Sequence, residues 1–467
     1  MNLKVRALTA LCSTSLLLTG CMVGPDYQRP ETDVPATYVE PASTDPSIAN
    51  LPWWEVFKDP VLIELIEEAL ANSQDLGIAV SRIEEAAANL GITRANQFPV
   101  LSAQGSAGRV SPSEETLPGS ETRNDYALSG VASFELDFWG KLRRATEGAR
   151  ADLLSTEAAA RNVTITLISA VASTYFQLLD LDDRLAISQR TLESRNESLG
   201  IIQARFDKGT VPALDVNQAE IESADAQASV AAFDREVRQT ENALSILVGS
   251  RPRLINRGAL DLSKQSLPDA IPAGLPMDIL ERRPDIYVAE QQLAAETARI
   301  GVARAERLPS ITLTGDFGYA SRDLDNLLSS DSESWGFFGD IFAPIFNSGQ
   351  LKSAEEAQRQ RAQQARLNYE VSVLNALRDV DDSLTAIRTY RAEHTARLRQ
   401  LTAARSAATL SRARYDGGVV SYLEVLDSER SLFDAEILES GTRQQELNAI
   451  VSLYRSLGGG WPTTQEP

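Results

Sequence analysis

Two long stretches of the chain carry apolar residues at steps of three and four and contain no helix-breaking proline. No proline occurs between Pro118 and Pro212, or between Pro344 and Pro462. In the second stretch the apolar positions are Leu367, Val371, Leu374, Leu377, Val380, Leu384, Ile387, Leu398 and Leu401. This spacing predicts a long helix that packs along its length against others. Residues 142–206 as one helix would reach roughly 98 Å at 1.5 Å per residue, so we expect a bundle or barrel of similar helices.

Short segments between the helical stretches alternate between apolar and polar residues. Residues 126–136 and 311–319 alternate most clearly, whereas residues 101–110 and 335–345 are less regular. The apolar face of the two clear segments consists of Tyr126, Leu128, Phe134, Leu136, Ile311, Leu313, Phe317 and Tyr319. Transmembrane β-strands have this length and pattern, although the strands of a soluble sandwich alternate as well. Four strands cannot close a membrane barrel, because the smallest barrels have about eight, so membrane strands would require several chains to pool them.

The chain is internally duplicated. Residues 204–216 (ARFDKGTVPALDV) return as residues 413–425 (ARYDGGVVSYLEV), at an offset of 413 − 204 = 209. Residues 90–95 (LGITRA) return as residues 300–305 (IGVARA), at an offset of 300 − 90 = 210. Matches in the same order at nearly the same offset indicate two tandem repeats.

We therefore expect a mainly helical protein with a small β part, built from two tandem structural repeats. The expected parts are a signal peptide (1–20), an N-terminal segment (21–70), a first repeat (71–255), a linker (256–284), a second repeat (285–458) and a tail (459–467). In each repeat a first helix precedes a β-hairpin, a long helix and a final helix. The last three are expected at about 99–138, 141–206 and 212–249 in the first repeat, and at about 309–346, 350–415 and 421–457 in the second.

The N-terminus has the pattern of a lipoprotein signal peptide. A short positive region precedes an apolar run, residues 7–18, which is shorter than the about 20 residues of a permanent membrane helix. The run ends in Leu-Thr-Gly-Cys, so cleavage would leave Cys21 as a lipid-carrying N-terminus. In an ordinary secreted protein Cys21 would be incidental. Because Cys12 lies within the signal, no disulfide or thiol site would remain after cleavage.

Charge and residue counts argue against several classes of function. The net charge of −20 argues against nucleic acid as a partner, because phosphate binding needs a basic surface. One histidine and three methionines leave little for a metal or acid–base site. The chain has no P-loop, GxGxxG, GxSxG or HExxH motif. We therefore expect no enzyme activity, no metal site and no cofactor other than a covalent lipid on Cys21.

Several short motifs lie outside the duplicated segments. They are residues 21–27 (CMVGPDY) with Pro30, Trp53 and Trp54 ahead of Phe57, Asp59 with Pro60, and residues 280–286 (LERRPDI) after Leu275 and Pro276. With these motifs and the duplication, the chain resembles the outer-membrane factors of bacterial tripartite efflux systems, the TolC-like proteins, and in particular their lipoprotein branch. The resemblance implies a homotrimer. Its twelve strands, four per chain, would form one outer-membrane β-barrel that continues as a long periplasmic α-helical barrel.

The resemblance also implies a function, partners and a location. The chain would be an outer-membrane channel subunit, a passive exit duct for drugs or other toxic small molecules. Its partners would be a periplasmic adaptor protein, an inner-membrane transporter of the RND type, outer-membrane lipid and further copies of itself. It would be lipid-anchored in the outer membrane of a Gram-negative bacterium, and Met22 after the lipidated cysteine fits that destination. The alternatives are a duct for type I protein secretion, cation efflux, or, in a different class, a periplasmic structural lipoprotein.

The turns that join the last two helices of each repeat are the expected periplasmic tip. They lie at residues 207–212 and 416–421, and Gly209 and Gly418 are predicted to have positive φ because each helix must reverse there. The residues that the resemblance assigns to adaptor contacts are Lys208, Gly209, Thr210, Gly417, Gly418 and Val419.

An acidic pair beyond the second turn is the candidate gate. Glu424 and Asp427 are three residues apart and so lie on one helix face. The resemblance implies that they form carboxylate rings that constrict the pore, and that Tyr415 helps to tie the closed tip. Val420 stands where some relatives carry an arginine, so a salt-bridge latch is not expected there. An acidic pair in so acidic a chain is also compatible with a solvated helix face.

Overall fold

The computed structural model describes residues 22–40, 58–113, 115, 118–119, 121–258, 262–265, 273–274 and 276–459. The predicted signal peptide, Cys21, Trp53, Trp54, Phe57, Leu275 and residues 460–467 of the predicted tail lie outside these residues. The chain divides into two compact units, and each unit draws residues from both halves of the sequence.

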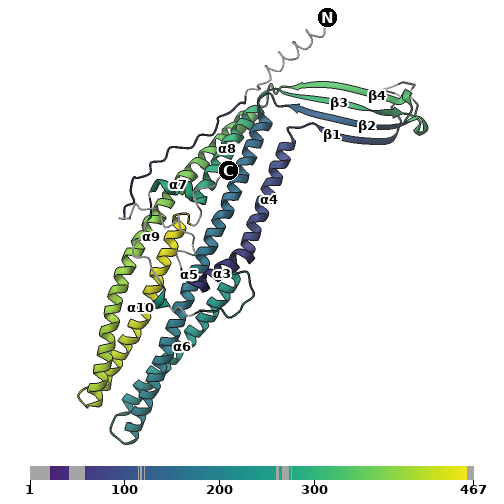
Figure 1. Ribbon diagram of the computed structural model, residues 1–467. Coiled ribbons are helices and arrows are strands. Elements are labelled where there is room, and N and C mark those ends of the chain that lie inside the picture. Colours follow the sequence, from purple (N-terminus) through teal and green to yellow (C-terminus); the bar gives the residue numbers. More distant parts are fainter. Residues whose placement is uncertain are drawn as a thin grey trace. The chain divides into compact units, whose positions relative to one another are not determined.

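Corresponding helices of the two halves have equal lengths, which confirms the two-repeat architecture (Figure 1). The first half contains α3 (Pro60–Asn72), α4 (Gln74–Ala95), β1 (Val100–Val110), β2 (Arg123–Leu136), α5 (Lys141–Asp207) and α6 (Ala213–Leu247). The short elements η2 (Leu262–Lys264), η3 (Pro276–Asp278) and α7 (Ile279–Arg282) follow. The second half contains α8 (Pro284–Ala305), β3 (Ser310–Ser321), η4 (Leu324–Asn326), η5 (Ser330–Ser332), β4 (Glu333–Phe342), α9 (Gln350–Asp416) and α10 (Tyr422–Ser456). Helices α5 and α9 both have 67 residues, α6 and α10 both have 35, and α4 and α8 both have 22.

The first unit (Met1–Glu31, Ser81–Glu157 and Val288–Glu370) contains a four-stranded sheet. Its strands are antiparallel in the order β1-β2-β3-β4, so the hairpins of the two repeats are joined through β2 and β3 (Figure 1). The register sets Leu136 opposite Ile311, Phe134 opposite Leu313, and Leu128 opposite Tyr319. The apolar rows predicted in two separate strands therefore lie on one face of the sheet.

This apolar face continues onto β4 and is open to the surroundings. Trp335, Phe337 and Ile341 are all exposed. The strand ends at Phe342, three residues before the predicted end at residue 345, because Pro344 has no N–H with which to continue the ladder. A contiguous exposed apolar face of this kind indicates contact with lipid or with another protein.

The described part of the N-terminal motif, residues 22–27, is bound within the first unit. The Val23 amide donates to the Trp139 carbonyl at 3.0 Å. The buried Arg144, in the first turn of α5, donates to Asp26 at 2.6 Å and to the Val23 carbonyl at 3.3 Å. Tyr27 donates to Glu290 of α8 at 3.1 Å. The motif therefore ties the start of the described chain to two helices of this unit.

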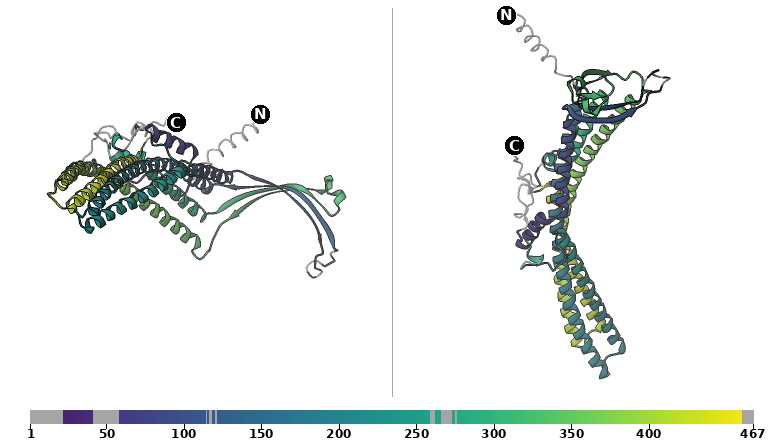
Figure 2. Two further views of the ribbon diagram at one scale, coloured as in Figure 1. Left: turned by 90° about the horizontal axis from the view of Figure 1, so that it is seen from below. Right: turned by 90° about the vertical axis from the view of Figure 1, so that its right-hand side faces the viewer.

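The second unit (Thr32–Val80, Ala158–Tyr287 and Val371–Pro467) contains two antiparallel helix hairpins. Hairpin α5–α6 and hairpin α9–α10 lie side by side in all three views (Figures 1 and 2). Helix α5 is long enough, and in places apolar enough, to cross a bilayer. However, 56% of its most apolar 18-residue stretch is buried in the protein. Since the apolar side chains Val171, Tyr175 and Phe176 are completely or almost completely buried, we assign that stretch to helix packing.

The Asp59-Pro60 motif begins α3 and anchors it to α5. The Asp59 carboxylate accepts hydrogen bonds from the amides of residues 61 and 62 at 2.9 and 3.3 Å, which caps the helix, and Pro60 occupies the first helical turn. The same carboxylate accepts from the buried hydroxyl of Tyr175 at 3.1 Å and from Gln265 at 2.6 Å. One acidic side chain thus satisfies donors from three segments.

Arg283, in the LERRPDI motif, joins three helices of the second unit. It donates to Asp285 in the first turn of α8 at 2.6 and 3.0 Å, to Asp379 of α9 at 3.2 Å, and to the Ser456 carbonyl at the end of α10 at 2.9 Å. A buried guanidinium with all these partners is a structural link, and its replacement would leave buried acceptors unpaired.

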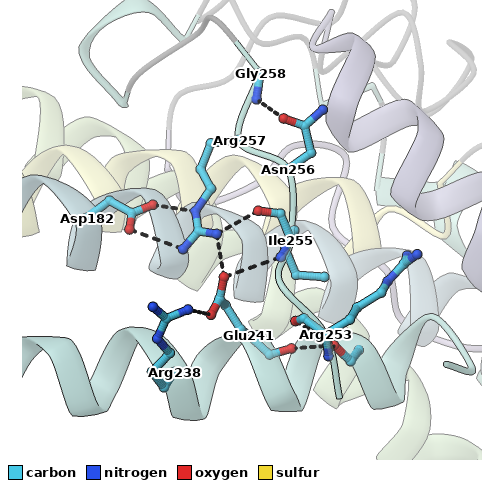
Figure 3. Close-up of polar contacts among 9 residues, drawn as sticks. Asp182, Arg238, Glu241, Arg253, Ile255, Asn256, Arg257 and Gly258 are labelled. Carbon is cyan, nitrogen blue, oxygen red and sulfur yellow. Dashed lines mark hydrogen bonds and ion pairs between the residues drawn. The ribbon is translucent and has the colours of Figure 1, made fainter. Parts of the chain in front are cut away.

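A polar network fixes the segment that follows α6 (Figure 3). Arg257 donates to Asp182 of α5 at 2.8 and 3.2 Å and also binds Glu241 of α6. The Glu241 side chain, 2% exposed, accepts further from the Ile255 amide at 3.3 Å and from Arg238 at 3.0 Å. Burial alone would raise the pKa of Glu241, but the hydrogen bond from Arg257 and these other donors hold it below its ordinary value.

Acid is therefore expected to loosen this segment. Because the folded-state pKa of Glu241 lies below its unfolded value, its contribution to stability is complete above the ordinary carboxyl pKa of about 4.3 and is lost as the pH falls through the depressed value. We expect hydrogen exchange of residues 250–258, corrected for intrinsic rate, to accelerate below about pH 4. Glu241→Gln should show the faster exchange already at neutral pH. Equal protection of the wild type in neutral and acidic buffer would contradict the prediction.

Candidate functional site

Each helix hairpin of the second unit ends in a glycine turn of the same geometry. Gly209 and Gly418 have φ values of 71° and 72°, as the sequence predicts. The Gly209 amide donates to the Phe206 carbonyl at 2.8 Å, and the Gly418 amide donates to the Tyr415 carbonyl at 2.9 Å. Both bonds close the last turn of a helix. The residues expected to contact an adaptor are all exposed at these turns: Lys208, Gly209, Thr210, Gly417, Gly418 and Val419.

An arginine from one hairpin reaches the end of the other. Nη2 of Arg205, near the end of α5, lies 3.5 Å from Oδ1 of Asp416 in α9. The guanidinium carbon of Arg205 is 5.1 Å from the centre of the Tyr415 ring, which packs against Tyr422 with ring centres 5.4 Å apart. The sequence does not predict this ion pair, because Arg205 and Asp416 belong to different helices and the position where some relatives carry an arginine is occupied by the uncharged Val420. The cation at this turn comes from α5 instead.

Apolar side chains from both hairpins form one cluster beneath the turns, here named the tip core. Its buried members are Ile202, Ala219, Tyr422, Val425 and Leu426, and Leu199, Val211, Val216 and Tyr415 pack against them. Burial raises the pKa of the Tyr422 hydroxyl to about 12, and the carboxylate of Glu429 adds to the rise. Each large apolar side chain that leaves such a cluster for water costs roughly 1.5–3 kcal/mol, so the tip core opposes separation of the hairpins.

A set of polar and charged side chains lies next to the tip core, here named the charged layer. It consists of Arg195 and Ser198 (α5), Glu222 and Asp225 (α6), Arg412 (α9), and Glu429 and Arg430 (α10). The Glu222 side chain, 6% exposed, lies 3.1 Å from Nη2 of Arg195 and accepts from Nε of Arg430 at 2.7 Å. Because Arg195 belongs to the same hairpin as Glu222 and Arg430 to the other, this carboxylate joins the two hairpins.

A second bridge in the charged layer starts from α9. Arg412 donates to Ser198 of α5 at 2.7 Å and to Glu429 of α10 at 3.3 Å. The guanidinium carbon of Arg195 also lies 5.7 Å from the centre of the Phe433 ring in α10. Arginines of both hairpins therefore make contacts across the boundary between them.

The predicted gate residues lie beside the tip core. Glu424 is partly exposed and lies 3.2 Å from Arg414 of its own hairpin, and Asp427 is exposed. Since Val425 and Leu426 between them are buried, the two carboxylates lie on a different face of α10 from the tip core. The tip core, Arg205 and the charged layer thus join the hairpins, as does the hydrogen bond that Ser440 of α10 donates to Asp180 of α5 at 2.6 Å, whereas the ion pair of Glu424 stays within its own hairpin.

The sequence carries a signal for the charged layer that its apolar periodicity alone does not reveal. Glu222 comes three residues after Ala219 and four before Ala226, both of which are buried, so it occupies the apolar stripe of α6. Arg195 likewise comes four residues before Leu199, which packs on the tip core. Charged residues inside an apolar stripe are rarely buried without a partner and so indicate buried ion pairs. The part of the chain that the structure describes contains no group of three or more His, Cys, Asp or Glu side chains placed to hold a metal ion.

Comparison with known proteins places both repeats in one family. Residues 65–250 and 275–459 match the family described as outer membrane efflux protein. The solvent efflux pump outer membrane protein SrpC of Pseudomonas putida is 38% identical over 460 residues, which cover 96% of this chain and 97% of that protein. The cation efflux system protein CusC of Escherichia coli K12 is 36% identical over 452 residues, or 96% of this chain and 98% of that protein. The crystal structure of the open state of the Neisseria gonorrhoeae MtrE outer membrane channel has a TM-score of 0.84 and 31% identity, covering 94% of this chain and 98% of that one.

Proposed function

This chain belongs to the outer membrane efflux protein family and is an outer-membrane channel of a tripartite efflux pump, and we propose that it is a passive exit duct. In this proposal, contacts between its two helix hairpins close the duct at its tip. The observation that carries the proposal is the pair of bridges in the charged layer, from Arg430 to Glu222 and from Arg412 to Ser198. The structural-lipoprotein alternative does not fit this family. The proposed cargo is drugs or other toxic small molecules, in line with the solvent efflux pump named for SrpC, and cation efflux, named for CusC, is the alternative.

The membrane part of the proposal uses the sheet of the first unit. Its exposed apolar face would contact lipid, and the outer edges of β1 and β4 have no strand neighbour within the described chain. Free edges are not tolerated in lipid, so three chains would pool twelve strands into one barrel. A lipid on Cys21 would add an anchor. The binding of the residues that follow it to Trp139 and Arg144 supports an anchor on the same unit as the sheet.

The partners in this proposal meet the exposed turns. A periplasmic adaptor would contact Lys208, Gly209 and Thr210 of one turn, and the residues 417–419 of the other. Their exposure and the shared turn geometry support this assignment, because both turns offer the same backbone shape to one partner. An inner-membrane transporter of the RND type would supply energy, so the channel itself needs none.

The acidic pair gives the direct test of the channel. In a trimer, Glu424 and Asp427 would each present three carboxylates around the axis and attract cations. We expect Glu424→Ala/Asp427→Ala to raise single-channel conductance in a planar bilayer and to lower cation selectivity. A matched control removes two exposed carboxylates from α6, in Asp234→Ala/Glu236→Ala. Pores that both double variants leave unchanged would disprove the acidic gate, and absence of pores from a folded, detergent-purified oligomer would disprove the channel.

A further inference from the structure

The charged layer contains two largely buried glutamates, Glu222 and Glu429, and fewer cations contact Glu429 than contact Glu222. Glu222 contacts two guanidinium groups, those of Arg195 and Arg430. Glu429, whose side chain is only 20% exposed, has one close cation, Arg412 at 3.3 Å. That cation is shared with Ser198, which is the nearer partner at 2.7 Å. Glu429 is therefore a largely buried charge with one guanidinium in direct contact, where Glu222 has two.

Charged or titratable groups face Glu429 from all four helices of the two hairpins. Arg412 of α9 and Arg195 of α5 favour its ionised form, whereas Glu222 of α6 disfavours it, and the phenol of Tyr422 lies on its own helix. Burial raises the pKa of Glu429 above its ordinary value, Arg412 and Arg195 oppose the rise, and Glu222 adds to it. The ionised carboxylate is thus less stable here than in water.

We propose that ionised Glu429 favours separation of the two hairpins, so that the tip opens more readily at neutral pH and closes in acid. This inference rests on the proposed function, in which opening separates the hairpins. In the separated state Glu429 regains water and keeps Arg412 of its own hairpin, so its pKa falls and the closed state binds the proton more tightly. Linkage then requires the proton to favour closure and its loss to favour opening.

The variant Glu429→Gln isolates this group, because it keeps the shape of the side chain and removes only its ionisation. Asp434→Asn is the matched control, since it makes the same change on the same helix at an exposed position. Openings of single channels and the distance between spin labels at Thr210→Cys and Val419→Cys, one in each turn, would be followed from the ordinary carboxyl pKa, about pH 4.3, to about pH 7.5. The distance reports hairpin separation without requiring a conducting pore.

We expect the wild type and Asp434→Asn to open several-fold more often, and to show longer label distances, at neutral pH than in acid. Glu429→Gln should open as rarely at neutral pH as the wild type does in acid, with most of the pH dependence lost. An unchanged pH profile in Glu429→Gln would overturn the inference and leave the channel function intact. More frequent opening of Glu429→Gln at neutral pH would also overturn it, by showing that the carboxylate ties Arg412 in place. If no protein conducts, the proposed function fails, and the label distances still decide on Glu429.

Discussion

Replacing Arg205 and Arg430 together by alanine should leave the channel open far more often than the wild type. Arg205 holds Asp416 and the Tyr415 ring, and Arg430 holds Glu222, so the double variant removes two contacts between the hairpins. Both arginine side chains are at least one third exposed, at 36% and 51%, and Glu222 keeps its contact with Arg195. The fold of each hairpin is therefore expected to survive.

The size of the effect follows from the exposure of these pairs. Exposed ion pairs contribute roughly 0.2–1 kcal/mol each. Two such contacts in one chain would then shift the balance by about 0.4–2 kcal/mol, roughly a 2- to 30-fold change in the ratio of open to closed tips. The measurement is the open probability of single channels. A matched control, Arg378→Ala/Arg405→Ala, removes two exposed arginines whose ion-pair partners, Asp379 and Glu436, lie on their own hairpin. A double variant as closed as that control would show that these contacts do not hold the tip.

The architecture could be predicted from sequence because it depends on local patterns. The proline-free stretches with three- and four-residue spacing correspond to α5 and α9, and strict alternation marks β2 and β3. Because the chain is duplicated, an element predicted in one repeat is also expected at the matching position of the other repeat. The predicted end of β4, at residue 345, was wrong because apolar residues continue past Pro344, whereas backbone hydrogen bonding does not.

The contacts that tie the hairpins could not be predicted in the same way. Arg430 and Glu222 are 208 positions apart, and nothing in either helix identifies its partner. The short motifs do not identify these contacts either, because those that lie in the described chain have structural roles. Asp59 caps a helix, and Arg283 joins three helices of the second unit. The described motifs outside the duplication thus mark packing, whereas the contacts of the charged layer depend on Arg412 and Arg430, which lie outside the motifs and the duplicated segments.

Glu222→Ala is expected to be the most destabilising single change in the charged layer. It removes the main ionic partner of Arg195, a side chain that is 4% exposed, and leaves the largely exposed Asp225 at 3.6 Å as its remaining carboxylate. The backbone carbonyl of residue 222, at 2.9 Å, and the Phe433 ring stay in contact with Arg195, but neither carries a negative charge. Removing one member of a buried ion pair costs about 3–5 kcal/mol, because the remaining charge stays buried without compensation. We expect faster hydrogen exchange near Arg195 and Glu222 in α5 and α6, together with lower resistance of the oligomer to heat.

A second variant separates this loss of stability from gating. Arg195→Met/Glu222→Leu replaces the buried pair by apolar side chains, and such replacements are often neutral or stabilising. It should therefore restore much of the protection lost in Glu222→Ala. The contact of Arg430 across the hairpins remains absent, so the tip should still open more often than the wild type. If Glu222→Ala were as stable as the wild type, water would have to reach Arg195, and the buried pair would not be what holds this part of the hairpin together. If the apolar pair restored stability and also closed the tip, packing rather than the Arg430 bridge would govern opening.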